Sequence, residues 1–183
     1  MKKALSLILV SLLLNQISVY SQSETINKYE KEIKENISKG SVAYLKEDYK
    51  KAIKYYSKAL ELDNKQAILN KTAWRVVVDN LGMSYGISGN TIKAKEMFEF
   101  GISKDSKYPM FYYNLACAYA ELNDLVNSII NLKLAFEYKE NMISGEKMPD
   151  PNKDSSFSKY LNNDKFQNAL KEIDNQTLNS PPL

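Results

Sequence analysis

The sequence predicts an all-α protein in which about three helical hairpins stack into a superhelix that a C-terminal helical segment caps. Two observations predict this fold. A pattern of small and large residues recurs with a period of about 34 residues, and apolar residues before and after the repeated region recur at helical spacing. The chain of 183 residues is 44% apolar, which suits a single domain with its own core.

The repeat is most complete in two stretches, which begin at Leu81 and Leu115. Aligned with each other, the stretches share a small residue, a tyrosine, a second small residue and a large apolar residue. The matching pairs are Gly82 and Ala116, Tyr85 and Tyr119, Ala94 and Ser128, and Phe98 and Leu132. A partial third copy lies upstream, around Gly40. Because a single helical hairpin cannot bury its apolar face alone, the repeated pattern predicts that the hairpins stack.

Each copy also carries the residues that a helical hairpin needs at its turn. Asp48, Asn90 and Asp124 stand where the second helix of each hairpin should begin, and their side chains are suited to cap it. We expect the small residues to let paired helices approach closely and the large residues to fill the space between hairpins. In this interpretation Gly40, Gly82 and Ala116 meet Ala52, Ala94 and Ser128, while Tyr56, Phe98 and Leu132 are the fillers.

This pattern resembles that of the tetratricopeptide repeat family. The resemblance is complete in the second copy, at Leu81, Gly82, Tyr85, Ala94 and Phe98. It indicates repeats at about residues 33–66, 75–108 and 109–142, within a region of 22–142. The resemblance implies a right-handed superhelix whose concave groove binds peptides or protein segments.

The first two copies are spaced eight residues more widely than the period. Eight residues make about two helical turns, so the sequence predicts a helical extension near residues 67–74, within one long helix from Gln66 to Ser88. Trp74 lies in this extension. It either covers the end of the first hairpin or contacts a partner.

Residues 143–174 are predicted to form a polar loop and C-terminal capping helices, and residues 175–183 a flexible tail. The capping segment carries apolar residues at helical spacing, namely Phe157, Tyr160, Leu161, Phe166, Leu170 and Ile173. Its sequence pattern resembles that of the terminal helices of bacterial members of the family. We expect it to cover the exposed face of the last hairpin. The alternative is an autoinhibitory segment that binds in the groove.

The first 21 residues have the features of a signal peptide, so the chain is expected to be exported. A basic start precedes a mostly apolar run over residues 4–14, and Val19 and Ser21 are small residues at the positions that a signal peptidase reads. The alternative is an uncleaved membrane anchor, but Asn15 and Gln16 end the apolar run well short of the ~20 residues that a span needs. We expect cleavage after Ser21 and a soluble periplasmic or secreted protein without stable membrane insertion.

The composition disfavours several chemical functions. The chain contains no His and one Cys, Cys117, so it lacks the commonest general base and cannot form a thiolate metal cluster. Cys117 is interpreted as a small packing residue, and no carboxylates are predicted to be paired inside an apolar setting that would raise a pKa. The formal charge of +3 falls to +1 without Lys2 and Lys3, which is no footprint for nucleic acid. We expect no enzyme activity, no cofactor, no metal and no nucleic-acid partner.

The leading hypothesis is a protein-interaction module that binds an extended segment of a partner polypeptide in the concave groove. By the geometry of the family, the groove-facing residues include Tyr44, Asp79, Asn80, Met83, Ile87, Tyr113 and Asn114. Asn80 and Asn114 are equivalent positions whose amides can pair with a peptide backbone; alternatively, they are ordinary polar residues on a hydrated face. The cationic clamp of family members that bind chaperone tails is largely absent, with Ile37, Met110 and Asn114 in three of its places. The alternative function is a structural subunit of an envelope or secretion assembly that binds through its convex or terminal faces.

Overall fold

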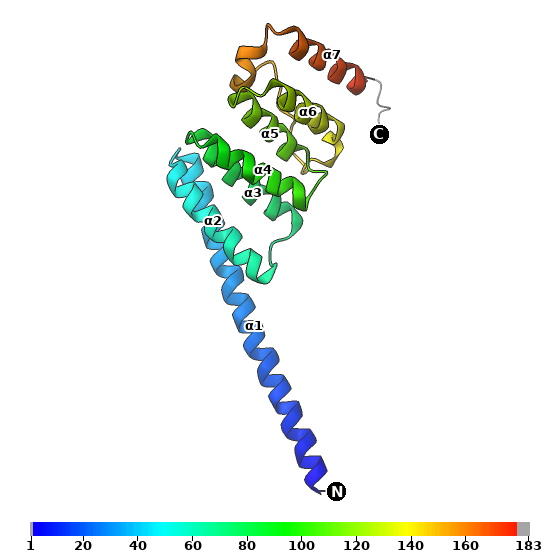
Figure 1. The fold of residues 1–183 in the computed structure, drawn as a ribbon. Coiled ribbons are helices and arrows are strands. Elements are labelled where there is room, and N and C mark those ends of the chain that lie inside the picture. The colour runs from blue at the N-terminus through cyan, green and yellow to red at the C-terminus, as the bar shows by residue number, and fades with distance from the viewer. Residues whose placement is uncertain (1, 179–183) are drawn as a thin grey trace.

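The computed structural model describes the backbone of residues 2–178 and the side chains of residues 23–175. This part of the chain is helical and contains no β-strand, so the predicted all-α class is confirmed. The α-helices are α1 (Lys2–Leu45), α2 (Tyr49–Gln66), α3 (Lys71–Ile87), α4 (Thr91–Lys104), α5 (Pro109–Glu121), α6 (Leu125–Glu137) and α7 (Asp164–Leu178), with short 3-10 helices η1 (Lys139–Asn141) and η2 (Ser155–Tyr160) before α7. Consecutive helices pair as α1–α2, α3–α4 and α5–α6, and the pairs stack side by side (Figure 1).

Helix α1 is longer than the repeat requires. The sequence places its start near Glu24, whereas the helix begins at Lys2, and its N-terminal part extends away from the stacked hairpins (Figure 1). The side chains of the predicted signal peptide, residues 1–21, lie outside the described residues. No helix in the described part of the chain is both long enough and apolar enough to cross a membrane.

The three hairpin turns have the same construction. In each turn one residue adopts a left-handed conformation, with φ of 58° at Glu47, 86° at Gly89 and 65° at Asn123. The next residue caps the following helix, and the predicted capping roles are confirmed. Asp48 accepts a hydrogen bond from the backbone N–H of Lys51, Asn90 from that of Lys93, and Asp124 from that of Asn127.

The repeated large residues are buried, but they pack against other partners than the sequence indicates. Tyr56 and Phe98 are 1% and 3% exposed. A methyl group on Gly40 would lie 2.9 Å from the ring of Tyr56, and one on Gly82 would lie 2.4 Å from the ring of Phe98. Each glycine therefore makes room for the large ring of its own hairpin, and the expected contact of Gly40 and Gly82 with the small residues is not what holds these helices close.

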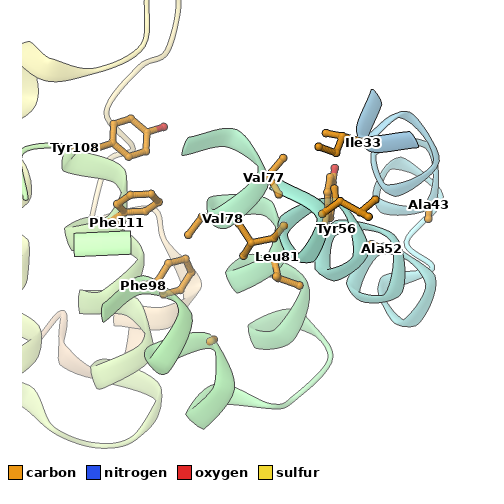
Figure 2. Close-up of a cluster of buried hydrophobic side chains, with 14 of the residues drawn as sticks. Ile33, Ala43, Ala52, Tyr56, Val77, Val78, Leu81, Phe98, Tyr108 and Phe111 are labelled. Atoms are coloured by element: carbon orange, nitrogen blue, oxygen red, sulfur yellow. The ribbon is translucent and has the colours of Figure 1, made fainter. Parts of the chain in front are cut away.

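The core runs through the stack from one hairpin to the next. Val77, Val78 and Leu81 of α3 lie between Tyr56 of the first hairpin and Phe98, as Figure 2 shows. Burial of this apolar surface stabilises the stack by about 25 cal/mol per Å². Because α3 contributes side chains toward both neighbours, the first two hairpins share one core cluster with the start of α5. A second cluster joins the rest of α5 and α6 to the C-terminal segment.

The structure differs from the predicted helical extension near residues 67–74. Helix α2 ends at Gln66, residues 67–70 are not helical, and α3 begins at Lys71. The physical reason is a local stop signal in the side chains. Buried Asp63 accepts hydrogen bonds from the backbone N–H groups of the two residues after Ala67, at 2.8 and 2.6 Å, and Ala67 itself is left-handed, with φ of 49°. Asn70 then caps α3, which completes the break between the helices.

Trp74 is part of the core between the second and third hairpins. Its ring centroid lies 5.9 Å from that of Phe100 and 5.9 Å from that of Phe111, the latter at a near-perpendicular angle of 89°. The side chain is half-buried. Trp74 therefore packs toward the third hairpin, where the sequence interpretation had placed it over the end of the first.

The C-terminal segment caps the last hairpin, as expected. Helix α7 packs against α6 and η2 packs against α5, and four of their apolar residues are buried: Phe157 of η2 and Phe166, Leu170 and Ile173 of α7. Lys133 of α6 and Glu172 of α7 form an ion pair at the edge of this contact. Helix α7 continues to Leu178, so only residues 179–183 of the expected tail remain, and these lie outside the described residues.

Candidate partner-binding groove

A pocket of about 470 Å³ lies between the inner helices α3 and α5. Helix α4 forms its floor, and residues 154–156, just before and at the start of η2, form its far wall. Its lining is mostly small or apolar on the α3 and α4 side and more polar on the α5 side. The lining residues are Gly82, Met83, Gly86, Ile87, Gly89, Thr91, Ala94, Phe98, Asn114, Cys117, Ala118, Glu121, Asp154, Ser155 and Ser156.

Three residues that the sequence assigned to the groove line this pocket. Met83 is half-buried, Ile87 is 53% exposed at the end of α3, and Asn114 reaches the pocket from α5. An exposed isoleucine beside a half-buried methionine offers an apolar contact surface next to an amide. This part of the predicted site is therefore brought together by the fold.

Tyr44 holds the first hairpin against the second. Its ring packs edge-on against Tyr49 at a centroid distance of 5.6 Å, and its hydroxyl donates a weak hydrogen bond to the sulfur of Met83 at 3.9 Å. Burial and the neighbouring Tyr49 and Asp79 raise the pKa of Tyr44 to about 12. The phenol is therefore neutral at physiological pH, and the side chain serves as a contact between α1 and α3.

The two equivalent asparagines have partners within the protein. Asn80 donates from Nδ2 to the hydroxyl of Tyr56 at 3.3 Å, and Asn114 donates from Nδ2 to Oδ1 of Asp79 at 2.7 Å. Each amide thus reaches the preceding hairpin. Since a carboxamide has two N–H donors and a carbonyl acceptor, each retains hydrogen-bonding capacity beyond these contacts.

Asp79 lies in an environment that sequence reasoning missed. Loss of hydration on burial raises the pKa of its carboxyl to about 7, the hydrogen bond from Asn114 acts in the opposite direction, and Glu146 adds to the rise. We did not predict this single buried carboxyl, since the sequence indicated only that no carboxylates are paired in an apolar setting. The signal was not visible in the sequence because burial of Asp79, the larger cause, depends on how the hairpins pack, and because Glu146 is far from Asp79 along the chain.

Tyr113 is not available on an open groove. It is 1% exposed, its hydroxyl donates to Oδ2 of Asp154 at 3.1 Å, and its ring packs edge-on against Phe157. The geometry of the family assigned it to the groove. The chain itself occupies this surface, so Tyr113 is corrected from a contact residue to an anchor for the C-terminal segment.

We call residues 141–156 the covering segment, since they cross the inner face of α5 on the way to α7 (Figure 1). Its first end is fixed by Arg75, which donates to the carbonyl of Asn141 at 3.1 Å, and by Tyr108, whose hydroxyl donates to Glu146 at 2.7 Å. Its other end is fixed by Asp154, which accepts from Tyr113. The covering segment therefore takes up groove surface that the repeats alone would leave open.

The anchor at Arg75 is itself buried and paired. Its Nε donates to Oδ2 of Asp105 at 2.7 Å, both side chains are about one-tenth exposed, and the guanidinium lies 4.5 Å from the ring centroid of Tyr108. The charges of Arg75 and Lys71 keep the pKa of Asp105 below its usual value in spite of the opposing effect of burial. This network joins α3 to the α4–α5 connection and to the covering segment.

Cys117 lies at the boundary between the covered and open parts of the groove. Its side chain is half-buried, and Sγ lies 3.7 Å from Oδ2 of Asp154. Burial raises the pKa of the thiol well above its usual value, with further contributions from Asp154 and Glu121. A neutral thiol is unreactive, in keeping with its interpretation as a packing residue. Among the described residues, no group of three or more His, Cys, Asp or Glu side chains could hold a metal ion.

Comparison with known proteins identifies the repeat. The tetratricopeptide repeat family matches residues 34–66 and again residues 111–142, which correspond to the hairpins α1–α2 and α5–α6. Two segments of the chain thus match the tetratricopeptide repeat (TPR). Its predicted resemblance to this family is thus confirmed at the level of the repeat, while the bacterial and exported character of the protein stays a prediction.

Among solved structures, the chain is similar to the crystal structure of the Sgt2 TPR domain from Aspergillus fumigatus. The two share 22% sequence identity at a TM-score of 0.54, over 83% of this chain and 86% of that chain. At this identity the likeness shows the fold. No curated protein matches the chain. TPR folds are typically scaffolds for protein–protein interaction rather than catalysts, and this is the general function that the repeats indicate.

Proposed function

We propose that this TPR protein binds an extended segment of a partner polypeptide in the part of its concave groove between α3 and α5. The observation that carries the proposal is the pocket of about 470 Å³, which remains open beside the covering segment. Pockets of a few hundred Å³ with an apolar lining and a few polar groups are typical of binding sites. Met83 and Ile87 supply apolar contact, and Asn114 supplies a carbonyl and a further N–H to a peptide backbone.

Capture of partners with wild-type and variant protein tests this proposal. Ile87→Glu places a charge at the rim of the pocket, and because Ile87 is 53% exposed the change leaves the fold intact. We expect the partner to be lost with this variant. Its matched control is Val126→Glu, at an apolar position on α6 that is 64% exposed, which should retain the partner.

The second candidate function is that of a structural subunit that binds through the convex face. Three apolar residues on the outer helices favour it, since Ile92, Val126 and Ile130 are 51%, 64% and 49% exposed. The same pair of variants separates the two functions. A partner that is lost with Val126→Glu and retained with Ile87→Glu would place the interface on the outer helices and contradict the groove proposal.

We also propose that the chain is exported after cleavage behind Ser21. The support lies in the sequence, in the basic start, the apolar run and the small residues before the cut. Mass spectrometry of the protein from the producing cell should then show a chain that begins at Gln22. An intact Met1 in a membrane fraction would contradict the proposal.

A further inference from the structure

We propose that the partner segment carries an apolar side chain flanked by lysine or arginine, so that the apolar group fills the pocket between α3 and α5 while the cation pairs with Glu121 and Asp154. This inference rests on the proposed function and specifies the chemistry of its partner.

The apolar half of the recognition comes from the floor of the pocket. Met83 and Ile87 of α3 and Phe98 of α4 contribute apolar surface, and Gly86 leaves a gap between them. A methyl group built on Gly86 would meet only the Cβ of Ala94, at an ordinary contact distance of 3.5 Å. The space above Gly86 is therefore free for an apolar side chain of the partner, and burial of that side chain would favour binding.

The charged half comes from two carboxylates on the opposite wall. Glu121, the last residue of α5, is exposed and forms no ion pair within the described part of the chain. Asp154 accepts hydrogen bonds from Tyr113, Cys117 and the backbone N–H of Ser156, and none of these donors carries a positive charge. Both carboxylates line the same pocket, Glu121 from α5 and Asp154 from just before η2, so one cation of the partner can approach both.

The lining of the pocket does not balance these charges. Its fifteen described residues include Glu121 and Asp154 but neither Lys nor Arg. A cationic side chain next to the apolar anchor would satisfy both carboxylates, whereas an acidic segment would be repelled at this wall. Complementary charge therefore selects a basic partner segment over an acidic one.

Selection from a random-peptide display library tests the inference, with the full-length protein as target. We expect enriched peptides to combine a large apolar residue with Lys or Arg within two positions of it. Binding of one enriched peptide, synthesised with a fluorescent label, is then measured by anisotropy. Glu121→Lys should weaken binding about tenfold or more, which corresponds to 1.4 kcal/mol. The control Glu96→Lys makes the same charge change at an exposed position on α4 outside the pocket and should leave the affinity within about twofold.

Variants at Gly86 separate failure of the inference from failure of the proposed function. Gly86→Leu should fill the pocket and abolish binding, while Gly86→Ala should preserve most of it, since a methyl group fits beside Ala94. If Gly86→Leu impairs folding, the rim variant Ile87→Glu gives the same test at an exposed position.

Each outcome has one meaning. Enriched peptides that are blocked by Gly86→Leu but are neutral or acidic, or whose affinity is unchanged by Glu121→Lys, would overturn the inference and leave groove binding intact. An absence of enriched peptides, or peptides whose binding is indifferent to both Gly86→Leu and Ile87→Glu, would overturn the proposed function and the inference together.

Discussion

The inner helices of the second and third hairpins share one sequence pattern but have different surroundings. Ile87, near the end of α3, is 53% exposed and lines an open pocket. Tyr113, on the inner face of α5, is 1% exposed beneath the covering segment. At equivalent positions 34 residues apart, Asp79 corresponds to Tyr113 and Met83 to Cys117, so the two helices present comparable faces to different neighbours.

The repeats determine which way a residue faces, while the non-repeated segments determine whether that face is open to a partner. The covering segment packs against the inner face of α5 and leads into η2 and α7, so this face is not open to a partner. The pocket is left at the border, with one wall from the repeats and one from residues 154–156. A groove predicted from the repeats alone is therefore larger than the groove that a partner can reach.

The largest effect on stability is expected at Phe157, which anchors the C-terminal segment against α5. Phe157 is fully buried, with Tyr113 edge-on at 6.0 Å and Phe166 at 5.4 Å. Phe157→Ala should lower the free energy of unfolding by about 3–5 kcal/mol, because it removes a large buried ring and leaves a cavity. Chemical denaturation measures the change. Ile87→Ala, at the rim of the open pocket, should change stability by less than about 0.5 kcal/mol. Equal losses of stability for the two variants would contradict the distinction between the covered face of α5 and the open pocket.

A smaller effect is expected from two glycines on α3. A methyl group on Gly82 would lie 2.4 Å from the ring of Phe98, so Gly82→Ala should cost up to about 3 kcal/mol through overpacking. A methyl group on Gly86 makes only an ordinary contact, so Gly86→Ala should be neutral or should stabilise the helix by up to about 1 kcal/mol. Thermal melting of both variants checks the prediction. If Gly86→Ala were less stable than Gly82→Ala, Gly86 and not Gly82 would be the residue of α3 that packs closely against α4.

The third prediction concerns how the stability of the protein depends on pH through the carboxyl of Asp79. Because burial raises the pKa of Asp79 to about 7 from 3.8, the folded protein holds a proton between about pH 4 and 7 that the unfolded chain has lost. Stability should therefore fall as the pH rises through this window. Asn114 of α5, Glu146 of the covering segment, Tyr44 and Tyr108 are the polar groups that face this carboxyl or feel its charge.

Asp79→Asn should abolish this part of the pH dependence. At pH 8 the variant should be more stable than the wild type by an amount on the order of 2 kcal/mol, after allowance for partial exposure of the side chain. Denaturation curves at pH 5 and pH 8 measure the effect. Parallel profiles for the two proteins would show that Asp79 titrates normally.

The smallest effect on stability is expected at the hairpin turns, which lie outside the pocket and the covering segment. Glu47 adopts a left-handed conformation with φ of 58°, where the second hairpin has Gly89. Glu47→Gly should stabilise the protein by up to about 1 kcal/mol by removing this strain. The corresponding Gly89→Ala should destabilise it by a similar amount, and a gain from Gly89→Ala would contradict the shared turn geometry.

Local and periodic features could be predicted from the sequence. The capping roles of Asp48, Asn90 and Asp124 depend on residues three positions away, so the pattern is sufficient to find them. The break after Gln66 was missed, because it depends on the side chain of Asp63, which satisfies two backbone groups beyond the end of its own helix. An acidic residue near a helix end gives too common a signal to reveal this stop.

The candidate site could be predicted only in part. Met83, Ile87 and Asn114 line the pocket, as the helical register indicated, and their role as binding residues stays a proposal. The burial of Tyr113 was not predicted, since its partner Asp154 is 41 residues away in a polar loop without periodicity. Such long-range contacts leave no repeated pattern in a single sequence.

The single native thiol, Cys117, can test whether residues near Asp154 cover the inner face of α5. Sγ of Cys117 lies 3.7 Å from the carboxylate of Asp154, so Asp154→Cys brings a second thiol within reach of it. Mild oxidation should give an intramolecular disulfide, detected by mass spectrometry as the loss of two thiols. The control Ser103→Cys, at an exposed position on α4, should keep both thiols free. Two free thiols in the Asp154→Cys variant, with both reacting as fast as in unfolded protein, would show that the covering segment does not lie on α5.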